Sequence, residues 1–201
     1  MKRKNNVSAL TGAIATGKSV VSRYFSENFD FKIIDADKIG HEVLKMPGVI
    51  KMIREEFGES VIKNEEVNRE KLRNIVFSDK SKLLLLNSIV HPKLIARLTE
   101  MIDALPDDQP VIFEAAVLIE AGWHKYFDRI IVTTCSPEIQ IKRVIARDGV
   151  NEAEVLKIIA SQLSYDERYA FADYIVDTSE GLENITVSLD EIAREIIAGG
   201  E

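Results

Sequence analysis

Residues 12–19 read GAIATGKS and match the pattern G-x-x-x-x-G-K-[ST]. An apolar, β-branched stretch at residues 7–11 precedes them, and apolar residues at helical spacing follow at Val20, Val21, Tyr24 and Phe25. A glycine-rich turn between a strand and a helix lets successive backbone N–H groups point into one concave space, where the helix N-terminus adds partial positive charge. The segment therefore predicts a phosphate-binding loop in an α/β fold, and an incidental glycine turn is the weaker interpretation.

In such a loop, Lys18 bridges the β- and γ-phosphates of a nucleotide, and Ser19 ligates Mg²⁺ through its hydroxyl. The loop does not identify the phosphoryl acceptor, because kinases, GTPases, motor ATPases and nucleotide switches share it. The predicted ATP-binding residues are Gly12, Ala13, Ile14, Ala15, Thr16, Gly17, Lys18, Ser19 and Val20.

Three exclusions narrow the class of protein. The sequence contains neither an N-K-x-D segment, which would select guanine, nor the L-S-G-G-Q signature of transporter ATPases. A chain of 201 residues is also too short for a large motor. A small-molecule kinase is the interpretation that remains.

Five short apolar segments are strand candidates, and helix-like sequence separates them. This alternation predicts a five-stranded parallel sheet covered on both faces, the three-layer architecture of P-loop NTPases. The candidates are residues 7–11, 31–34, 111–113, 129–133 and 174–176.

A long block between the second and third strand candidates reads as helix, except for breaks at 46–48, Gly58 and His91-Pro92. The apolar run 83–86 is expected to lie in its core. A connection between two parallel strands does not need so many residues. We therefore expect an inserted helical substrate domain at residues 37–105.

A second helical segment follows the fourth strand candidate. Ser136 and Pro137 are suited to start one helix, and Asn151 with Glu154 to start the next. We expect a helical hairpin that acts as a lid over residues 139–169, with the nucleotide-binding core at 1–36, 106–138 and 170–201.

Asp35 and Asp37 follow the second strand candidate, at the sheet edge where α/β proteins bind ligands. In an extended segment, alternate side chains face the same way, so both carboxylates could face a γ-phosphate. One would accept the proton of an attacking hydroxyl while the other orients it or holds metal-bound water. The structural alternative is an N-cap followed by a turn aspartate.

An ordered set of motifs gives a more specific resemblance. The stretches are LTGAIATGKS, FKIIDAD, VNREKLRNIVF, LNSIVHPKL, VIFEAAVLIEAGW, and RVIARDG continuing to Gln162. In this order and at this spacing, they resemble the dephospho-CoA kinase family from Leu10 to about Ser179. The individual later motifs are weak, and their order carries the resemblance.

The resemblance implies a kinase that uses ATP and Mg²⁺ to phosphorylate the ribose 3′-hydroxyl of dephospho-CoA, the last step of coenzyme A synthesis. It implies Asp37 as general base, with Asp35 in reserve, and places Arg69 and His91 at the acceptor. A different small kinase, acting on a nucleoside monophosphate or a sugar, and a non-catalytic ATP switch remain the alternatives.

Arg143 and Arg147 are four residues apart on one predicted helix, so they share a face and could clamp the transferring phosphoryl group. Solvated surface arginines are the alternative interpretation. The resemblance favours Arg147, because this residue precedes Asp148-Gly149 at the lid. It assigns Gln162 a mainly structural role.

The sequence departs from the family pattern at several positions. The common loop is G-G-I-G-S-G-K-[ST], whereas this chain has Ala13 and Ala15, which must use ordinary backbone angles or accept strain. Glu114 stands where the family has aspartate, and it could still contact the metal ion through a bound water. Thr178 stands where asparagine is frequent.

Bulk properties exclude further classes. A net charge of −7 with scattered lysines and arginines argues against a nucleic-acid partner. No apolar run approaches the ~20 residues that a membrane span needs. Because the single Cys135 cannot form an intrachain disulfide, a cytoplasmic location is expected, for a monomer or a small homo-oligomer.

Overall fold

The computed structural model describes residues 6–77 and 79–199. The chain forms two compact units, one made of Met1–Ile34 and Pro106–Glu201, the other of Asp35–Leu105. The expected inserted block, 37–105, differs from the second unit by two residues at its start. Residues 139–169, the expected lid, belong to the first unit.

The first unit contains a five-stranded sheet in the order β2-β5-β1-β6-β7. β1 pairs in parallel with β5 and β6, and β6 pairs in parallel with β7. Every residue of β1 is buried, as expected for a central strand covered on both faces. The predicted parallel five-stranded sheet is confirmed, with strands β1 Val7–Gly12, β2 Lys32–Asp35, β5 Val111–Glu114, β6 Arg129–Thr134 and β7 Tyr174–Asp177.

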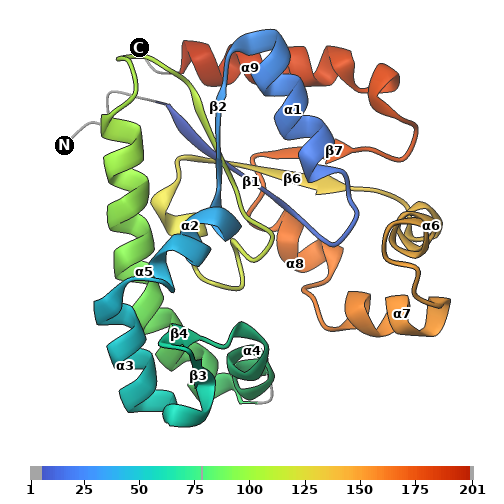
Figure 1. Cartoon of the computed structure of the whole chain (residues 1–201). Helices are drawn as coiled ribbons and strands as arrows, with labels where there is room; N and C mark the ends of the chain where they lie inside the picture. Colours follow the sequence, from blue (N-terminus) through green and yellow to red (C-terminus); the bar gives the residue numbers. More distant parts are fainter. Residues whose placement is uncertain (1–5, 78, 200–201) are drawn as a thin grey trace. The chain divides into compact units, whose positions relative to one another are not determined.

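Helices cover both faces of this sheet, with α1 and α9 on one face and α8 on the other (Figure 1). The main core lies between the sheet and the first pair, where Phe25 of α1, Ile131 of β6 and Leu189 of α9 are all buried. The helical segments of this unit are α1 Lys18–Phe29, η2 His124–Tyr126, α6 Pro137–Asp148, α7 Glu152–Ala160, α8 Tyr165–Tyr169, η3 Leu182–Asn184 and α9 Thr186–Ala198.

Local capping explains where the α6–α7 hairpin begins and turns. Ser136 caps α6 by accepting from the Ile139 amide, and Gly149, with φ 68°, ends the helix in the left-handed conformation. Asn151 and Glu154 then form a capping box at the start of α7. Both predicted helix starts are confirmed.

The second unit is helical but also contains a small hairpin that the sequence interpretation missed. β3 and β4 pair antiparallel, and Asn64 and Glu65 between them have φ 52° and 61°. Two consecutive positive φ values are typical of a tight hairpin turn. The elements are α2 Ala36–Val43, α3 Pro47–Phe57, η1 Glu59–Val61, β3 Ile62–Lys63, β4 Glu66–Val67, α4 Arg69–Phe77 and α5 Lys80–Asp103.

Two expectations for the second unit were wrong. His91-Pro92 does not interrupt the helix, because Pro92 lies inside the 24-residue helix α5. Packing offsets the backbone hydrogen bond that proline removes, since Leu94 and Leu98 just beyond it are buried. The leucine run is also not core: none of residues 83–86 is buried, and Leu84 is 62% exposed, because consecutive helical residues point around the whole axis.

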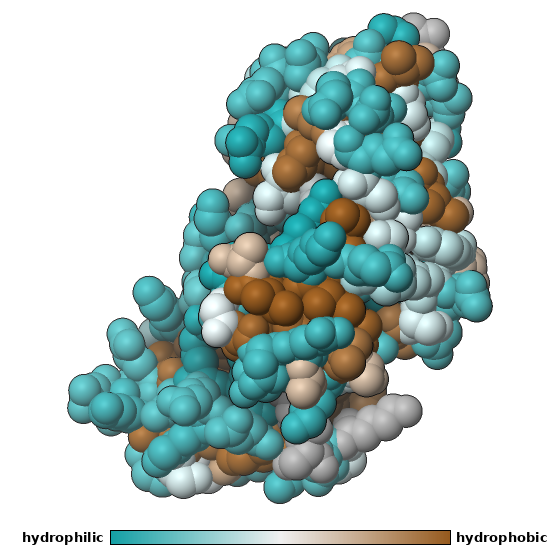
Figure 2. Space-filling model, turned by 90° about the vertical axis from the view of Figure 1, so that its right-hand side faces the viewer, coloured by the Kyte–Doolittle hydropathy of each residue, from teal (hydrophilic) through white to brown (hydrophobic). Residues whose placement is uncertain are grey.

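The surface retains apolar side chains on the α6–α7 hairpin, where Leu156 is 50% exposed. Figure 2 shows the face seen from the right of Figure 1, and apolar side chains gather there among hydrophilic ones. Within residues 6–77 and 79–199, no helix combines the length and apolarity needed to cross a membrane.

Candidate active site

The predicted phosphate-binding loop connects β1 to α1, with Gly12 at the end of the strand and Gly17 at the helix N-cap. Both glycines are required sterically. A Cβ at Gly12 would lie 2.2 Å from Thr133 Oγ1, and one at Gly17 would lie 2.9 Å from Thr178 Oγ1. Gly17 also has φ 87°, which favours glycine. The local strand-turn-helix context is therefore the one that the motif needs.

Protein donors hold the carbonyl oxygens of this loop. Lys18 Nζ donates to the Gly12 and Ala13 oxygens, at 2.9 and 3.1 Å. Thr178 Oγ1 donates to the Thr16 oxygen at 3.1 Å. These bonds fix the loop backbone and hold the Lys18 ammonium beside it. A glycine-containing turn that leads into a helix N-terminus, with an ammonium held at it, is an arrangement that binds anions.

Ala15 adopts the strained alternative. Its φ is 58°, whereas Ala13 is not among the described non-glycine residues with positive φ. A left-handed residue with a Cβ costs about 1–2 kcal/mol. Such strain persists only where the surroundings impose it, and the Ala15 oxygen accepts from Arg143 Nη1 at 3.4 Å.

Two glutamines hold Ile14, the residue before Ala15. Gln162 Oε1 accepts from the Ile14 amide at 3.0 Å, and Gln140 Nε2 donates to the Ile14 oxygen at 2.8 Å. Gln162 thus fills the structural role expected for it. Sequence reasoning missed Gln140, although its spacing of four residues from buried Val144 places it on the inner face of α6.

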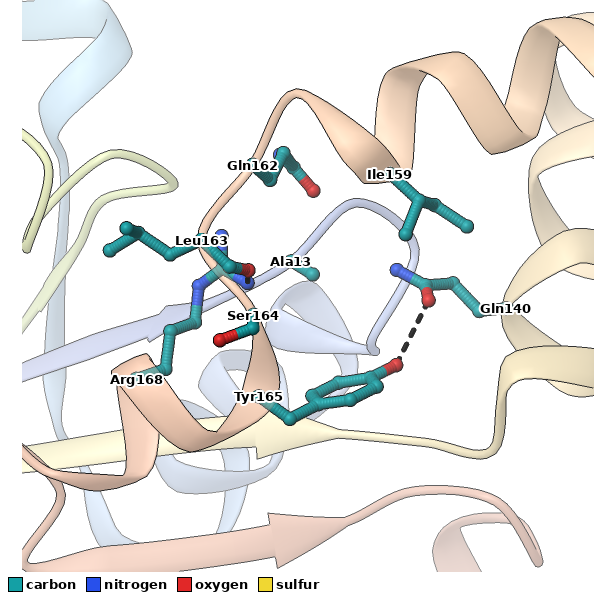
Figure 3. A pocket seen from close by; sticks show the side chains of 8 residues that line it. All are labelled: Ala13, Gln140, Ile159, Gln162, Leu163, Ser164, Tyr165 and Arg168. Atoms are coloured by element: carbon teal, nitrogen blue, oxygen red, sulfur yellow. Dashed lines mark hydrogen bonds between the residues drawn. The ribbon is translucent and has the colours of Figure 1, made fainter.

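Beside the loop lies a small cavity of about 60 Å³, whose lining Figure 3 shows. Arg168 is 1% exposed there and donates to Glu120 Oε1 at 3.0 Å and to the Leu163 oxygen. A buried arginine needs such partners, because an unpaired buried charge is strongly unfavourable. Neither Arg168 nor Glu120 was predicted. The cavity is lined by Ala13, Gln140, Ile159, Gln162, Leu163, Ser164, Tyr165 and Arg168.

Ser19 and Glu114 come together at the same end of the sheet. Ser19 Oγ, in the first turn of α1, lies 3.4 Å from Glu114 Oε1 at the end of β5. A hydroxyl and a carboxylate are hard oxygen donors, which suit Mg²⁺ with its remaining positions filled by water and phosphate. Among the described residues, no group of three or more His, Cys, Asp and Glu could hold a metal by itself. The residues present therefore fit a magnesium ion that arrives with a nucleotide.

The two predicted aspartates do not lie on one extended segment, and that expectation was wrong. Helix α2 starts at Ala36, so Asp35 is its N-cap and Asp37 lies in its first turn. Asp35 Oδ1 accepts from the amides of Asp37 and Lys38, at 2.8 and 3.3 Å. Asp37 is exposed. The cap alternative therefore describes Asp35, and its carboxylate is engaged by backbone.

Arg143 and Arg147 share α6 but differ in their contacts. Arg143 donates to both Thr178 Oγ1 and the Thr178 oxygen, at 2.8 and 2.7 Å. Arg147 forms a two-pronged pair with Asp148, at 2.7 and 2.8 Å, and this guanidinium lowers the pKa of the Asp148 carboxyl. Arg143 therefore supports the loop and Thr178, while Arg147 lies toward the α6–α7 turn.

The predicted acceptor residues both lie in the second unit. Arg69 is the first residue of α4, and His91 lies within α5. These two helices contact each other.

Comparisons with known proteins agree with one another. A family model described as Dephospho-CoA kinase matches residues 6–184. A Dephospho-CoA kinase of Fusobacterium nucleatum is 39% identical over 188 residues, covering 93% of this chain and 96% of that protein. The solved Dephospho-CoA kinase from Campylobacter jejuni has a TM-score of 0.68 at 25% identity, covering 98% of this chain and 100% of that chain. A shikimate kinase from Acinetobacter baumannii shares the fold, with a TM-score of 0.51 at 18% identity, covering 96% and 93% of the two chains.

Proposed function

This chain belongs to the dephospho-CoA kinase family, and from that premise we propose that it phosphorylates the ribose 3′-hydroxyl of dephospho-CoA with ATP. The products are coenzyme A and ADP. The observation that carries the proposal is a loop at residues 12–19 that joins β1 to α1 and holds the Lys18 ammonium, in a chain matched to the family over residues 6–184.

The loop positions the triphosphate for in-line transfer. Lys18 neutralises charge on the β- and γ-phosphates, and the residues from Gly12 to Val20 line the polyphosphate, except for the Ile14 amide, which donates to Gln162. Ser19 and Glu114 would hold Mg²⁺, the second directly or through water. When bound, the ion would supply positive charge to the phosphate oxygens. Catalysis in such a site is mainly positioning and electrostatic stabilisation.

Asp37 is the proposed general base. Its carboxylate is exposed, whereas that of Asp35 accepts two backbone N–H groups. A base must be able to reach the hydroxyl proton of the acceptor, and a carboxylate engaged as a helix cap is less available. Asp37 would take the 3′-hydroxyl proton as the oxygen attacks the γ-phosphorus.

Arginines would stabilise the charge that develops during transfer. Arg147 is the proposed contact to the moving phosphoryl group, and it would exchange its bond to Asp148 for that contact. Arg143 acts mainly through the loop. Arg69 and His91, in the second unit, are proposed acceptor contacts.

The remaining features follow from this activity. We propose that 37–105 serves as the substrate domain, that 139–169 serves as a lid over ATP, and that 1–36, 106–138 and 170–201 form the core. The reaction needs no nucleic acid or membrane partner. A cytoplasmic monomer or small homo-oligomer, in which ATP and dephospho-CoA are available, fits this role.

An acceptor panel tests the proposal. ADP release is measured with Mg²⁺ and ATP alone, then with dephospho-CoA, nucleoside monophosphates and sugars, and the product is located by mass spectrometry. We expect stimulation by dephospho-CoA and a phosphate on its ribose 3′-oxygen. Stimulation only by another acceptor would replace the proposal with a different small kinase. Tight ATP binding without stimulation by any acceptor would indicate a switch.

A further inference from the structure

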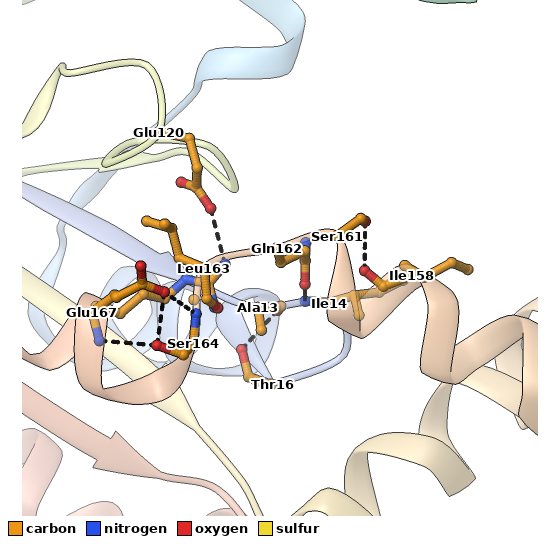
Figure 4. Close-up of polar contacts among 12 residues, drawn as sticks. Ala13, Ile14, Thr16, Glu120, Ile158, Ser161, Gln162, Leu163, Ser164 and Glu167 are labelled. Carbon is orange, nitrogen blue, oxygen red and sulfur yellow. Dashed lines mark hydrogen bonds and ion pairs between the residues drawn. The ribbon is translucent and has the colours of Figure 1, made fainter. Parts of the chain in front are cut away.

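Ile14 is the loop residue whose two backbone polar groups are both bound by side chains from the α6–α7 region. Its N–H donates to Gln162, just after α7, and its C=O accepts from Gln140, in α6. Figure 4 shows the Gln162 contact reaching the loop between β1 and α1. The expected lid thus carries, near each of its ends, a glutamine bonded to the same loop residue.

We propose that Gln140 and Gln162 are positioning residues that impose the backbone conformation of Ile14 and Ala15, and thereby set the affinity of the loop for nucleotides. The role rests on the proposed function only where turnover is measured.

The geometry of the peptide unit explains how they act. Because a peptide is planar and trans, fixing the Ile14 oxygen on Gln140 also fixes the Ala15 N–H, which points away from Gln140. Fixing the Ile14 N–H in the same way orients the Ala13 oxygen, which accepts from Lys18 and Thr16. The two consecutive peptide planes on either side of Ile14 are then set. The next plane is held by the bond from Arg143 Nη1 to the Ala15 oxygen, and between the second and third planes Ala15 keeps φ 58°.

The two glutamines have opposite and fixed amide orientations. Gln140 must present its NH₂ group to a carbonyl, and Gln162 must present its oxygen to an N–H. The Tyr165 hydroxyl lies 2.9 Å from Gln140 Oε1, a contact drawn in Figure 3, and 3.0 Å from the Cys135 oxygen. Burial raises the pKa of Tyr165, so its hydroxyl keeps the one proton that the Gln140 and Cys135 oxygens share, and this favours the Gln140 orientation with Oε1 toward Tyr165. Gln140 itself is 1% exposed.

Ala15 makes this support necessary. A glycine would adopt a positive φ without steric cost, whereas alanine relaxes toward ordinary angles once the bonds at Ile14 are lost. The N–H groups would then turn away from the phosphates. The effect of each glutamine should therefore depend on which residue occupies position 15.

The test measures the dissociation constant for ADP, with Mg²⁺ and without acceptor, by isothermal titration calorimetry. Gln140→Leu and Gln162→Leu are each made alone and together with Ala15→Gly. We expect a rise of about tenfold for each alone, the scale of one lost hydrogen bond, and of about threefold or less beside Ala15→Gly. Gln109→Leu is the matched control, because Gln109 donates to the Asp30 oxygen elsewhere in the same unit, and it should change affinity by less than about twofold.

Several outcomes would overturn the proposal. Unchanged ADP affinity in both single variants would do so, as would losses of equal size with and without Ala15→Gly. If buried Gln140→Leu fails to fold, partly buried Gln162→Leu and Tyr165→Phe carry the test, the latter with an expected rise of about threefold. In turnover, KM for ATP should rise while KM for the acceptor stays constant. ADP binding is measured without an acceptor, so a failed acceptor assignment would leave this result intact.

Discussion

Ser19 Oγ and Glu114 Oε1 lie 3.4 Å apart, although 95 positions separate the two residues in the chain. The end of β5 and the start of α1 thus bring a hydroxyl and a carboxylate to one place. Parallel strands make this possible, because their carboxyl ends meet at one edge of the sheet, beside the loop that follows β1.

Ser19→Ala should weaken the use of Mg²⁺. Losing one of two oxygen donors should raise the Mg²⁺ concentration for half-maximal ADP release and lower kcat by about 10²-fold. Glu114→Gln should have a smaller effect in the same direction, since an amide oxygen still accepts from metal-bound water. Ser26→Ala, on the exposed side of α1, is the matched control. A Mg²⁺ dependence identical to that of the unmodified protein would contradict the assignment.

Lys18→Ala should abolish phosphoryl transfer while preserving the fold. The ammonium group is held at the loop by the Gly12 and Ala13 oxygens, and its removal takes away a positive charge expected at the β- and γ-phosphates. Activity should fall by at least about 10³-fold, with an unchanged circular dichroism spectrum and melting temperature within a few degrees. Lys32→Ala, at an exposed position of β2, should remain active. Near-normal turnover of Lys18→Ala would sink the assignment.

Substitution of Asp35 should affect stability, whereas substitution of Asp37 should affect catalysis. Asp37→Asn should lower kcat by about 10²-fold or more with little change in KM for ATP, because it removes a proton acceptor. Asp35→Ala should lower the free energy of unfolding by about 1 kcal/mol, whereas Asp35→Asn keeps a capping side chain and should lose much less. If Asp35→Asn alone reduced kcat, the two roles would have to be exchanged.

The two arginines of α6 should also differ. Arg143→Ala removes donors to Thr178 and to the Ala15 oxygen, so both nucleotide affinity and the melting temperature should fall. Arg147→Ala removes only an exposed pair with Asp148, so the melting temperature should hardly change while kcat falls by about 10-fold or more. Arg194→Ala, exposed on α9, serves as control for both. If Arg147→Ala lowered the melting temperature but left kcat unchanged, Arg147 would have no role in phosphoryl transfer.

Because of Cys135, the free energy of unfolding should decrease as pH rises through the alkaline range. Burial raises the pKa of its thiol, so the unfolded chain deprotonates at a lower pH than the folded protein. Its contribution to stability is therefore fully present below the unfolded pKa of about 8.5 and is lost as pH rises toward the folded value. Urea unfolding at pH 7.5 and 9.5 should show a smaller decrease for Cys135→Ala than for the unmodified chain. An equal decrease would show that the thiol does not contribute.

The sequence was sufficient to predict features set by local patterns. The parallel sheet followed from apolar runs, and the starts of α6 and α7 followed from capping residues, because caps and strand patterns act over a few positions. Asp35 was misjudged although its bonds are also local. Its carboxylate accepts from backbone amides as a helix cap, so α2 begins at Ala36 and the segment is not extended through Asp37. Pro92 was misjudged because packing around α5 overrides its local preference.

Contacts between distant segments were the least predictable. Gln140 and Ile14 are 126 positions apart, and neither residue type is diagnostic of such a bond. Arg168 carries an ordinary charge, and its burial and its pairing with Glu120 become visible only once the chain is folded. The spacing of residues within a motif does not indicate which residue of another helix or strand will contact them.

The threonine side chains beside the loop have a consequence for how its sequence can drift. Thr133 lies next to Gly12, and Thr178 lies next to Gly17, so a methyl group at either glycine would clash with the neighbouring threonine. Ala13 and Ala15 already carry that methyl group. A library that randomises the loop should consequently recover tolerated replacements at positions 13 and 15. Positions 12 and 17 should remain glycine even when the facing threonine is shortened, because a Cβ at Gly12 also lies 2.6 Å from the Thr133 backbone oxygen, and Gly17 has φ 87°.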